Sequence, residues 1–99
     1  MKTFSVGTFN VRGLNDQNKR KNLSTDLKNY NFDVICLQET KIKEGCSEDI
    51  DGNELICFDK KQEAHGLDFI VSRKCRNSVE RQWKVNDRIA VIGIEQLHC

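Results

Sequence analysis

Two polar residues, Asn10 and Glu39, each stand at the end of a segment that is typical of a β-strand. Four apolar residues, Val34 to Leu37, precede Gln38 and Glu39, and such a run is typical of a strand buried on both faces. This strand would deliver the Glu39 carboxylate to the carboxyl edge of a sheet, where open α/β sheets bind their ligands. A carboxylate on a rigid element is a good ligand for Mg²⁺. The alternative is a glutamate that merely ends a strand in solvent.

The segment from Thr3 to Val11 alternates with the period of a strand. One face carries Phe4, Val6, Thr8 and Asn10, and the other carries Ser5, Gly7, Phe9 and Val11. Turn-forming residues follow at 12–15, so Asn10 also stands at the end of its strand. Its amide can hydrogen-bond a phosphate oxygen, a metal-bound water or a neighbouring carboxylate. The alternative is an asparagine that closes a turn.

Between the two strands the sequence predicts a helix that Asn15 or Asp16 can cap. Leu23, Leu27 and Tyr30 recur at i, i+4 and i+7, which is typical of a buried helix face. The exposed face is predicted to carry Lys19, Arg20, Lys21, Asp26 and Lys28. A right-handed strand–helix–strand crossover would bring the ends of both strands to one edge, provided that the strands lie close together.

Phe9 to Leu14, the intervening helix and Leu37 to Lys41 resemble the opening of the endonuclease/exonuclease/phosphatase superfamily. Exonuclease III-type abasic-site endonucleases, secreted deoxyribonuclease I and the endonucleases of non-long-terminal-repeat retrotransposons belong to it. The sequence of these motifs is most similar to the retrotransposon branch and to craniofacial development protein 2-like sequences. Three later segments support the resemblance in the family's order: Leu55 to Phe58, Gly66 to Ser72 and Trp83 to Ile89.

The resemblance implies an α/β (α+β) fold, a four-layer sandwich of two mostly antiparallel sheets with helices outside. The 99 residues would form a single truncated domain, the N-terminal half of that sandwich. Further strands are expected at Glu54 to Phe58, Leu67 to Ser72 and Arg88 to Glu95, with a polar turn region at Lys74 to Val79. Unpaired sheet edges would invite self-association or pairing with a complementary C-terminal fragment.

The resemblance also implies a site and a partner. Glu39 would bind Mg²⁺ or Mn²⁺ with help from the Asn10 amide, and both would be catalytic residues in DNA cleavage. Arg12 would contact a backbone phosphate, and Lys41 would steady the metal-binding carboxylate or the substrate. For Arg12 and Lys41 the alternative is an ordinary surface charge.

The family's later motifs, an Asp-x-Asn pair and a closing Ser-Asp-His, cannot be placed here in the family's order, and His98 has no Asp before it. Three hypotheses follow. The chain is a residual metal-dependent nuclease completed by association, a catalytically dead module that binds DNA or phosphate, or a truncated retroelement reading frame without selected activity. We expect the chain to be inactive alone.

Composition indicates an intracellular protein, nuclear or cytoplasmic, without a membrane partner. The 16 basic and 15 acidic residues nearly cancel, so no global field favours nucleic acid. No apolar run is long enough to span a membrane, and the first residues do not resemble a signal peptide. The five cysteines are widely spaced, and Cys36 and Cys57 are interpreted as reduced core residues.

Two acidic segments need an interpretation of their own. Ser47, Asp49 and Asp51 have the spacing of half a calcium loop, but the rest of that loop is missing, so an acidic surface turn from 43 to 54 is predicted. Asp68 stands where relatives usually have glycine. A buried, unpaired carboxylate would cost several kcal/mol, so a local distortion or a solvent-facing edge is predicted at Asp68.

Overall fold

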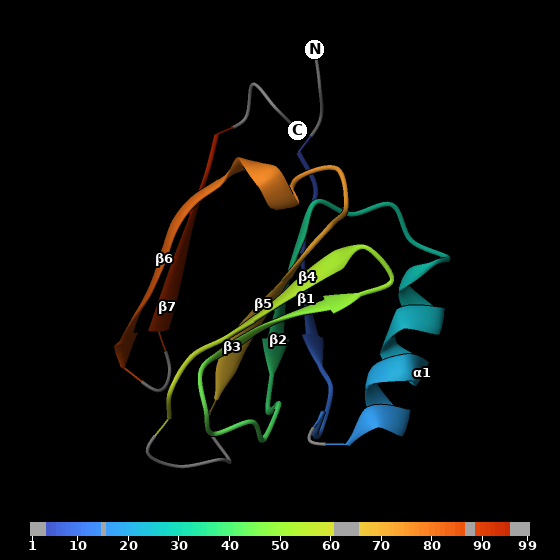
Figure 1. The fold of residues 1–99 in the computed structure, drawn as a ribbon, viewed down its shortest axis with the longest axis horizontal. Helices are drawn as coiled ribbons and strands as arrows, with labels where there is room; N and C mark the ends of the chain where they lie inside the picture. Colours follow the sequence, from blue (N-terminus) through green and yellow to red (C-terminus); the bar gives the residue numbers. More distant parts are fainter. Residues whose placement is uncertain (1–3, 15, 61–65, 87–88, 96–99) are drawn as a thin grey trace.

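The computed structural model describes residues 4–14, 16–60, 66–86 and 89–95 (Figure 1). Its elements, in chain order, are β1 (Val6–Asn10), α1 (Gln17–Leu27), β2 (Val34–Gln38), β3 (Cys46–Ile50), β4 (Asn53–Cys57), β5 (Leu67–Val71), a 3-10 helix (Arg76–Ser78), β6 (Val79–Asn86) and β7 (Ile89–Ile94). None of the described helices is long and apolar enough to cross a membrane.

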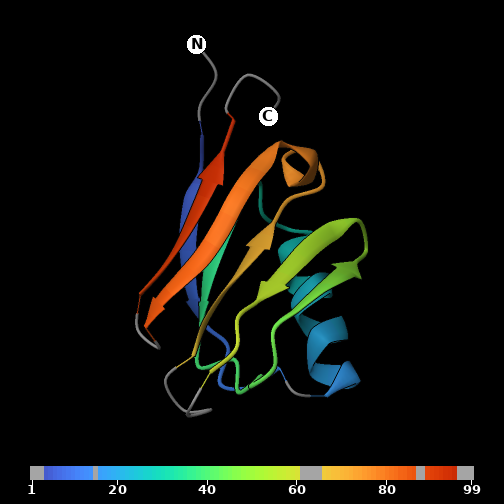
Figure 2. The same cartoon turned by 60° about the vertical axis from the view of Figure 1, so that its left-hand side comes forward.

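Three layers make up the described part of the chain. The central sheet has the strand order β1-β2-β5-β4-β3, in which only β1 and β2 are parallel neighbours. The antiparallel pair β6-β7 forms a second sheet. Figures 1 and 2 show this pair on one side of the central sheet and α1 on the other. The predicted fold class, a partial α/β sandwich of two mostly antiparallel sheets, is confirmed.

Each face of the central sheet buries its own apolar cluster. The cluster on the α1 side contains Leu14, Leu23, Leu27, Ile35, Leu37, Ile42, Ile50, Leu55, Cys57 and Ile70. The cluster under the β6-β7 pair contains Val34, Ile56, Phe58, Phe69, Val71 and Cys75. Strand β2 contributes to both clusters, as predicted for a strand that is buried on both faces.

Helix α1 begins as predicted and ends earlier than predicted. The Asp16 side chain accepts a hydrogen bond from the Lys19 N–H at 2.9 Å and caps the helix, whereas Asn15 lies outside the described residues. Leu23 and Leu27 are buried, but Tyr30 follows the end of the helix and is 69% exposed, so its place in the predicted buried face is wrong. The Tyr30 N–H bonds the Leu27 carbonyl at 3.1 Å, in the turn that leads the chain into β2.

Arg20 also departs from the predicted exposed face of the helix. Its Nε donates to the Leu14 carbonyl at 2.8 Å, and its guanidinium pairs with Glu48 on β3 at 2.8 Å. The guanidinium therefore joins the helix to the far edge of the central sheet. A helical wheel cannot reveal this contact, because it depends on a strand that comes 28 residues later.

The predicted acidic turn from 43 to 54 is wrong for most of its length, since Cys46–Ile50 forms the edge strand β3. Only Asp51 and Gly52 form the turn into β4, and Gly52 has a φ of 91°, which favours glycine. The Ser47 hydroxyl donates to Glu54 across the two strands, and Asp49 pairs with Arg76. The residues that have the spacing of half a calcium loop therefore belong to the β3-β4 strand pair and its turn.

Candidate functional site

The ends of β1 and β2 lie side by side. In the parallel pairing Asn10 is the register partner of Gln38, and the Val11 N–H bonds the Gln38 carbonyl at 3.1 Å. The chain after β1 then continues to pair with the chain after β2: the Gly13 N–H bonds the Glu39 carbonyl at 2.7 Å. The expected meeting of Asn10 and Glu39 at one edge of one sheet is therefore confirmed.

The Asn10 amide has a local hydrogen bond at this edge. Its Oδ1 accepts the Arg12 N–H at 3.2 Å, so Asn10 does close the turn after β1. The side chain is nevertheless exposed, and its amide N–H groups have no hydrogen-bond acceptor among the described residues. Turn closure and a contact with a phosphate oxygen are compatible, because an amide has both acceptor and donor atoms.

Glu39 and its two charged neighbours have an unusual backbone conformation. Arg12, Glu39 and Lys41 have φ values of 51°, 55° and 60°, in the left-handed region that favours glycine. Arg12 and Lys41 are exposed, and Glu39 is half-buried with its N–H bonded to the Gly66 carbonyl at 3.1 Å. Strained non-glycine residues cluster at binding and catalytic sites. Three of the four predicted site residues therefore share this strain, and among the described residues Asp51, in the β3-β4 turn, is the other non-glycine residue with a positive φ.

A buried carboxylate holds the segment that carries Glu39. Thr40, the next residue, is fully buried, and its hydroxyl donates to Asp68 on β5. Asp68 also accepts the Phe58 N–H at 3.0 Å and two bonds from the Lys60 Nζ, at 2.7 and 2.9 Å. The prediction that Asp68 is distorted or faces solvent is wrong, because Lys60 supplies the partner that makes burial tolerable.

Lys60 was missed by the sequence analysis. Its Nζ also donates to the carbonyls of Ile42 and Phe58, at 2.7 and 2.9 Å, so all three of its hydrogens have acceptors. A Cβ at Gly66 would overlap the Lys60 side chain, so a glycine is needed there for the ammonium group to reach Asp68. Burial raises the pKa of Asp68, and the bonds from Lys60, Thr40 and Phe58 act in the opposite direction. The sequence did contain a signal for Lys60: Asp68 lies in an apolar strand, and a buried carboxylate needs a cation as its partner.

The donor atoms at this edge suit part of a hard-metal site. Across the described ranges, no group of three or more His, Cys, Asp or Glu side chains could hold a metal ion. Among the described residues, the edge offers the Glu39 carboxylate and two side-chain amides, on Asn10 and on its register partner Gln38. Mg²⁺ keeps several waters and is held by one or two carboxylates together with substrate phosphates. Glu39 and Asn10 could therefore supply some of the ligands of a Mg²⁺ ion, and water and substrate phosphates would supply the rest.

A comparison with protein families found a match that covers this edge. Residues 7–52 match the Endonuclease/Exonuclease/phosphatase family. The match runs from β1 to the β3-β4 turn and includes Asn10, Arg12, Glu39 and Lys41. It supports assignment to the endonuclease/exonuclease/phosphatase superfamily, whose members are in general metal-dependent. No curated protein matches the chain.

Proposed function

We propose that these 99 residues are the N-terminal part of a Mg²⁺-dependent DNA endonuclease of the retrotransposon type, in which Mn²⁺ can replace Mg²⁺. The observation that carries the proposal is the meeting of Asn10 and Glu39 at one sheet edge within the matched residues 7–52. This is the edge at which open α/β sheets bind ligands.

In this proposal each residue of the edge has a separate task. Glu39 binds the metal ion, and the Asn10 amide holds a metal-bound water or a phosphate oxygen. When bound, the ion polarises the phosphodiester and stabilises charge on the leaving oxygen. Arg12 and Lys41 are exposed cations beside this position and suit contacts with backbone phosphates. Such contacts fix the position of the protein on the DNA without recognising its base sequence.

We further propose that these residues do not cleave DNA alone. The run from Asp51 to Asn53 has the residue types of the family's Asp-x-Asn motif, but it comprises the two residues of the β3-β4 turn and the first residue of β4. That turn precedes Glu54, which pairs with Val71 at the end of β5 that is remote from Gln38 and Glu39. Among the residues that the structure describes, the edge has no histidine and no second carboxylate to act as a base, and without them a barrier reduction of ~8 kcal/mol or more is difficult to supply. A complementary C-terminal fragment or a second copy would have to complete the site.

A paramagnetic titration tests the metal site without requiring activity. Mn²⁺ added to the ¹⁵N-labelled protein should broaden the amide signals of residues 10–13 and 38–41 first. Glu39→Ala should abolish this selective broadening. Glu44→Ala removes an exposed carboxylate from the adjacent loop and is the matched control, which should leave the broadening in place. Equal broadening in the wild type and in Glu39→Ala would overturn the metal role of Glu39.

Plasmid nicking tests whether the partial site is completed. The purified protein should not nick supercoiled DNA in Mg²⁺ or Mn²⁺, either before or after addition of EDTA. Cleavage that requires both the metal and Glu39 would contradict the proposed inactivity and would make assembly the next question. A sharp cooperative thermal transition of the same sample would show that the protein folds. This result would count against the hypothesis of a truncated retroelement reading frame.

A catalytically inactive module that binds DNA or phosphate is the second candidate. The exposed cations Arg12 and Lys41, on the same edge as the Asn10 amide, favour it. DNA binding should then persist at moderate salt and fall on Arg12→Ala. Lys21→Ala, on the exposed side of α1, is the control for loss of one positive charge. Equal DNA binding by the Arg12 and Lys21 variants would remove this candidate.

A further inference from the structure

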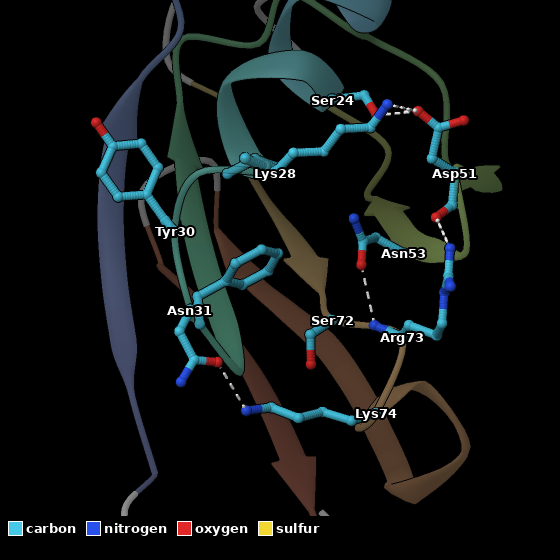
Figure 3. A pocket seen from close by; sticks show the side chains of 11 residues that line it. Ser24, Lys28, Tyr30, Asn31, Asp51, Asn53, Ser72, Arg73 and Lys74 are labelled. Atoms are coloured by element: carbon cyan, nitrogen blue, oxygen red, sulfur yellow. Dashed lines mark hydrogen bonds and ion pairs between the residues drawn. The ribbon is translucent and has the colours of Figure 1, made fainter.

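We propose a second binding site, for a nucleotide, at the opposite end of the central sheet. A cavity of about 650 Å³ lies between the C-terminal end of α1, the β3-β4 turn and the chain after β5 (Figure 3). Strand β5 is antiparallel to β2, so the chain after Val71 leaves the sheet at the end remote from Glu39. Pockets for small organic ligands commonly have volumes of roughly 300–1,000 Å³.

A buried hydroxyl without a partner indicates that this cavity takes a polar ligand. Ser72 lines the cavity and is only 7% exposed, yet its Oγ has no hydrogen-bond partner among the described residues. Figure 3 shows this hydroxyl among the polar side chains of the cavity, with no dashed line to it. Buried polar atoms are nearly always paired. The Oγ itself has almost no accessible surface, so a ligand in the cavity that Ser72 lines would pair it after a rotation of the side chain.

The polar side chains around Ser72 present hydrogen-bond donors. The Asn53 Oδ1 already accepts the Arg73 N–H at 2.9 Å, and the Asn31 Oδ1 accepts the Lys74 Nζ at 3.2 Å (Figure 3). Both amides therefore use their oxygens within the protein and retain N–H groups for a ligand. A ligand that is rich in acceptor atoms suits such a set.

The charge of the cavity favours an anion. Its lining includes the cations Lys28, Arg73 and Lys74 and a single carboxylate, on Asp51. The Asp51 carboxylate lies 3.9 Å from the Lys28 Nζ, and Asp33 lies behind Lys74, at 3.0 Å from its Nζ. Positive charge still exceeds negative charge, and the Lys28 side chain is 68% exposed, so it can turn toward a phosphoryl group while Lys74 stays bonded to Asn31 and Asp33.

The other wall of the cavity is apolar and aromatic, with Leu27, Tyr30 and Phe32. Tyr30 exposes 69% of its surface at the rim, and Figure 3 shows its ring directed away from Ser72, so the ring must turn to contact a ligand. Flat organic rings stack on such side chains. A nucleotide is an acceptor-rich anion that carries a flat ring, and it is the ligand we propose, either free or at the phosphorylated end of a nucleic acid strand.

This inference does not depend on the proposed endonuclease function. The cavity and the edge at Asn10 and Glu39 share no residues and lie at opposite ends of β2 and β5. A titration in EDTA keeps metal away from Glu39, so the result reports the cavity alone. The two proposals can therefore fail separately.

The test is a calorimetric and NMR titration of the 99-residue protein in EDTA with adenosine 5′-monophosphate, adenosine and inorganic phosphate. Adenosine 5′-monophosphate should bind at least about tenfold more tightly than adenosine, because charged hydrogen bonds are lost with the phosphate. Its shift changes should map to residues 27–32, 53 and 72–74. A 5′-phosphorylated oligodeoxyadenylate that binds more tightly still would identify a strand end, and equal affinity would identify a free nucleotide.

Two variants have matched controls. Ser72→Ala removes only the unpartnered hydroxyl, so it should preserve the fold and weaken binding about tenfold. Lys28→Glu should weaken binding further, whereas Lys19→Glu, at the other end of α1, makes the same charge change away from the cavity and should not. Wild-type affinity in both Ser72→Ala and Lys28→Glu would overturn the proposal. Equal affinity for adenosine and its monophosphate would overturn it too.

Discussion

Lys60 and Asp68 form an ion pair that is completely buried, with the Lys60 Nζ 2.7 Å from the Asp68 Oδ1 and neither side chain exposed. The same carboxylate accepts the hydroxyl of Thr40, the residue next to Glu39. The pair therefore fixes the chain directly beneath the candidate metal ligand. Such a link between a buried pair and a surface carboxylate suits a side chain whose position must be exact within a fraction of an ångström.

Lys60→Met should lower the free energy of unfolding by about 3–5 kcal/mol. The cause is the Asp68 carboxylate, which would stay buried and lose two of its hydrogen bonds. Urea denaturation followed by circular dichroism measures the loss. Adding Asp68→Leu to Lys60→Met should cost much less than the sum of the two single changes, because no unpaired charge remains. Additive losses would show that the two side chains do not interact.

Lys41→Gly should raise the free energy of unfolding by about 0.5–1 kcal/mol, because Lys41 has a φ of 60° and glycine relieves that strain. The Lys41 side chain is exposed, so little packing is lost. Lys43→Gly is the control, since Lys43 is also exposed and does not have a positive φ. It should be destabilising by a similar amount. Denaturation midpoints compare the variants, and destabilisation by Lys41→Gly would argue against strain at this position.

The site edge was predictable because it follows from local patterns and one topological rule. The apolar run before Gln38 and the alternation before Asn10 each predict a strand, and a parallel pairing necessarily brings both carboxyl ends together. The resemblance to the superfamily rests on the residues at those ends, and the family match over residues 7–52 supports it. The sequence left two alternatives open for Asn10, and only the structure shows that its Oδ1 accepts the Arg12 N–H and closes the turn.

The elements that were missed depend on tertiary pairing. Strands β3 and β6 carry mostly polar or exposed side chains, so their hydrophobic pattern is weak and only the pairing with β4 and β7 makes them strands. Lys60 was missed because its acceptor lies eight residues later and is reached only past Gly66. The cavity around Ser72 was missed because it joins a helix end, a turn and a loop that are far apart in sequence.

Asp33 should make the protein lose stability in acid. Burial acts to raise the pKa of Asp33, but hydrogen bonds from the Ser5 N–H, Lys74 and Cys75 outweigh it, and the pKa lies below its ordinary value of 3.8. A carboxyl group with a lowered pKa contributes its stability fully above the ordinary value. That contribution is lost as the pH falls through the lowered pKa.

Asp33→Asn tests this pH dependence. The variant should be about 1–2 kcal/mol less stable at neutral pH, because bonds to a charged group are lost. The difference from the wild type should shrink as the pH falls below about 4. Asp26→Asn, on the exposed side of α1, is the control. A difference between Asp33→Asn and the wild type that is constant from pH 7 to pH 3 would contradict the assignment of the acid sensitivity to Asp33.

Cys46 should react with oxidised glutathione before any other described cysteine. Cys46 is exposed, whereas Cys57, its register partner on β4, is buried. Burial, with the nearby Asp68 carboxylate, raises the pKa of Cys57, and burial also raises that of Cys36. These thiols therefore supply little thiolate, the form that attacks a disulfide.

Partners directly opposite in an antiparallel pair have Cα atoms about 4.5–5.5 Å apart, close enough for a disulfide. We nevertheless expect a mixed disulfide at Cys46 to accumulate at neutral pH. The second step needs the Cys57 thiol to lose its proton in a buried place, so an internal Cys46–Cys57 bond should form slowly and faster as the pH rises. Intact-mass and peptide-mapping mass spectrometry of a Cys99→Ser variant separates the two products. Cys46→Ser should abolish both, and rapid closure of the internal bond at pH 7 would show that the Cys57 thiol is readily ionised.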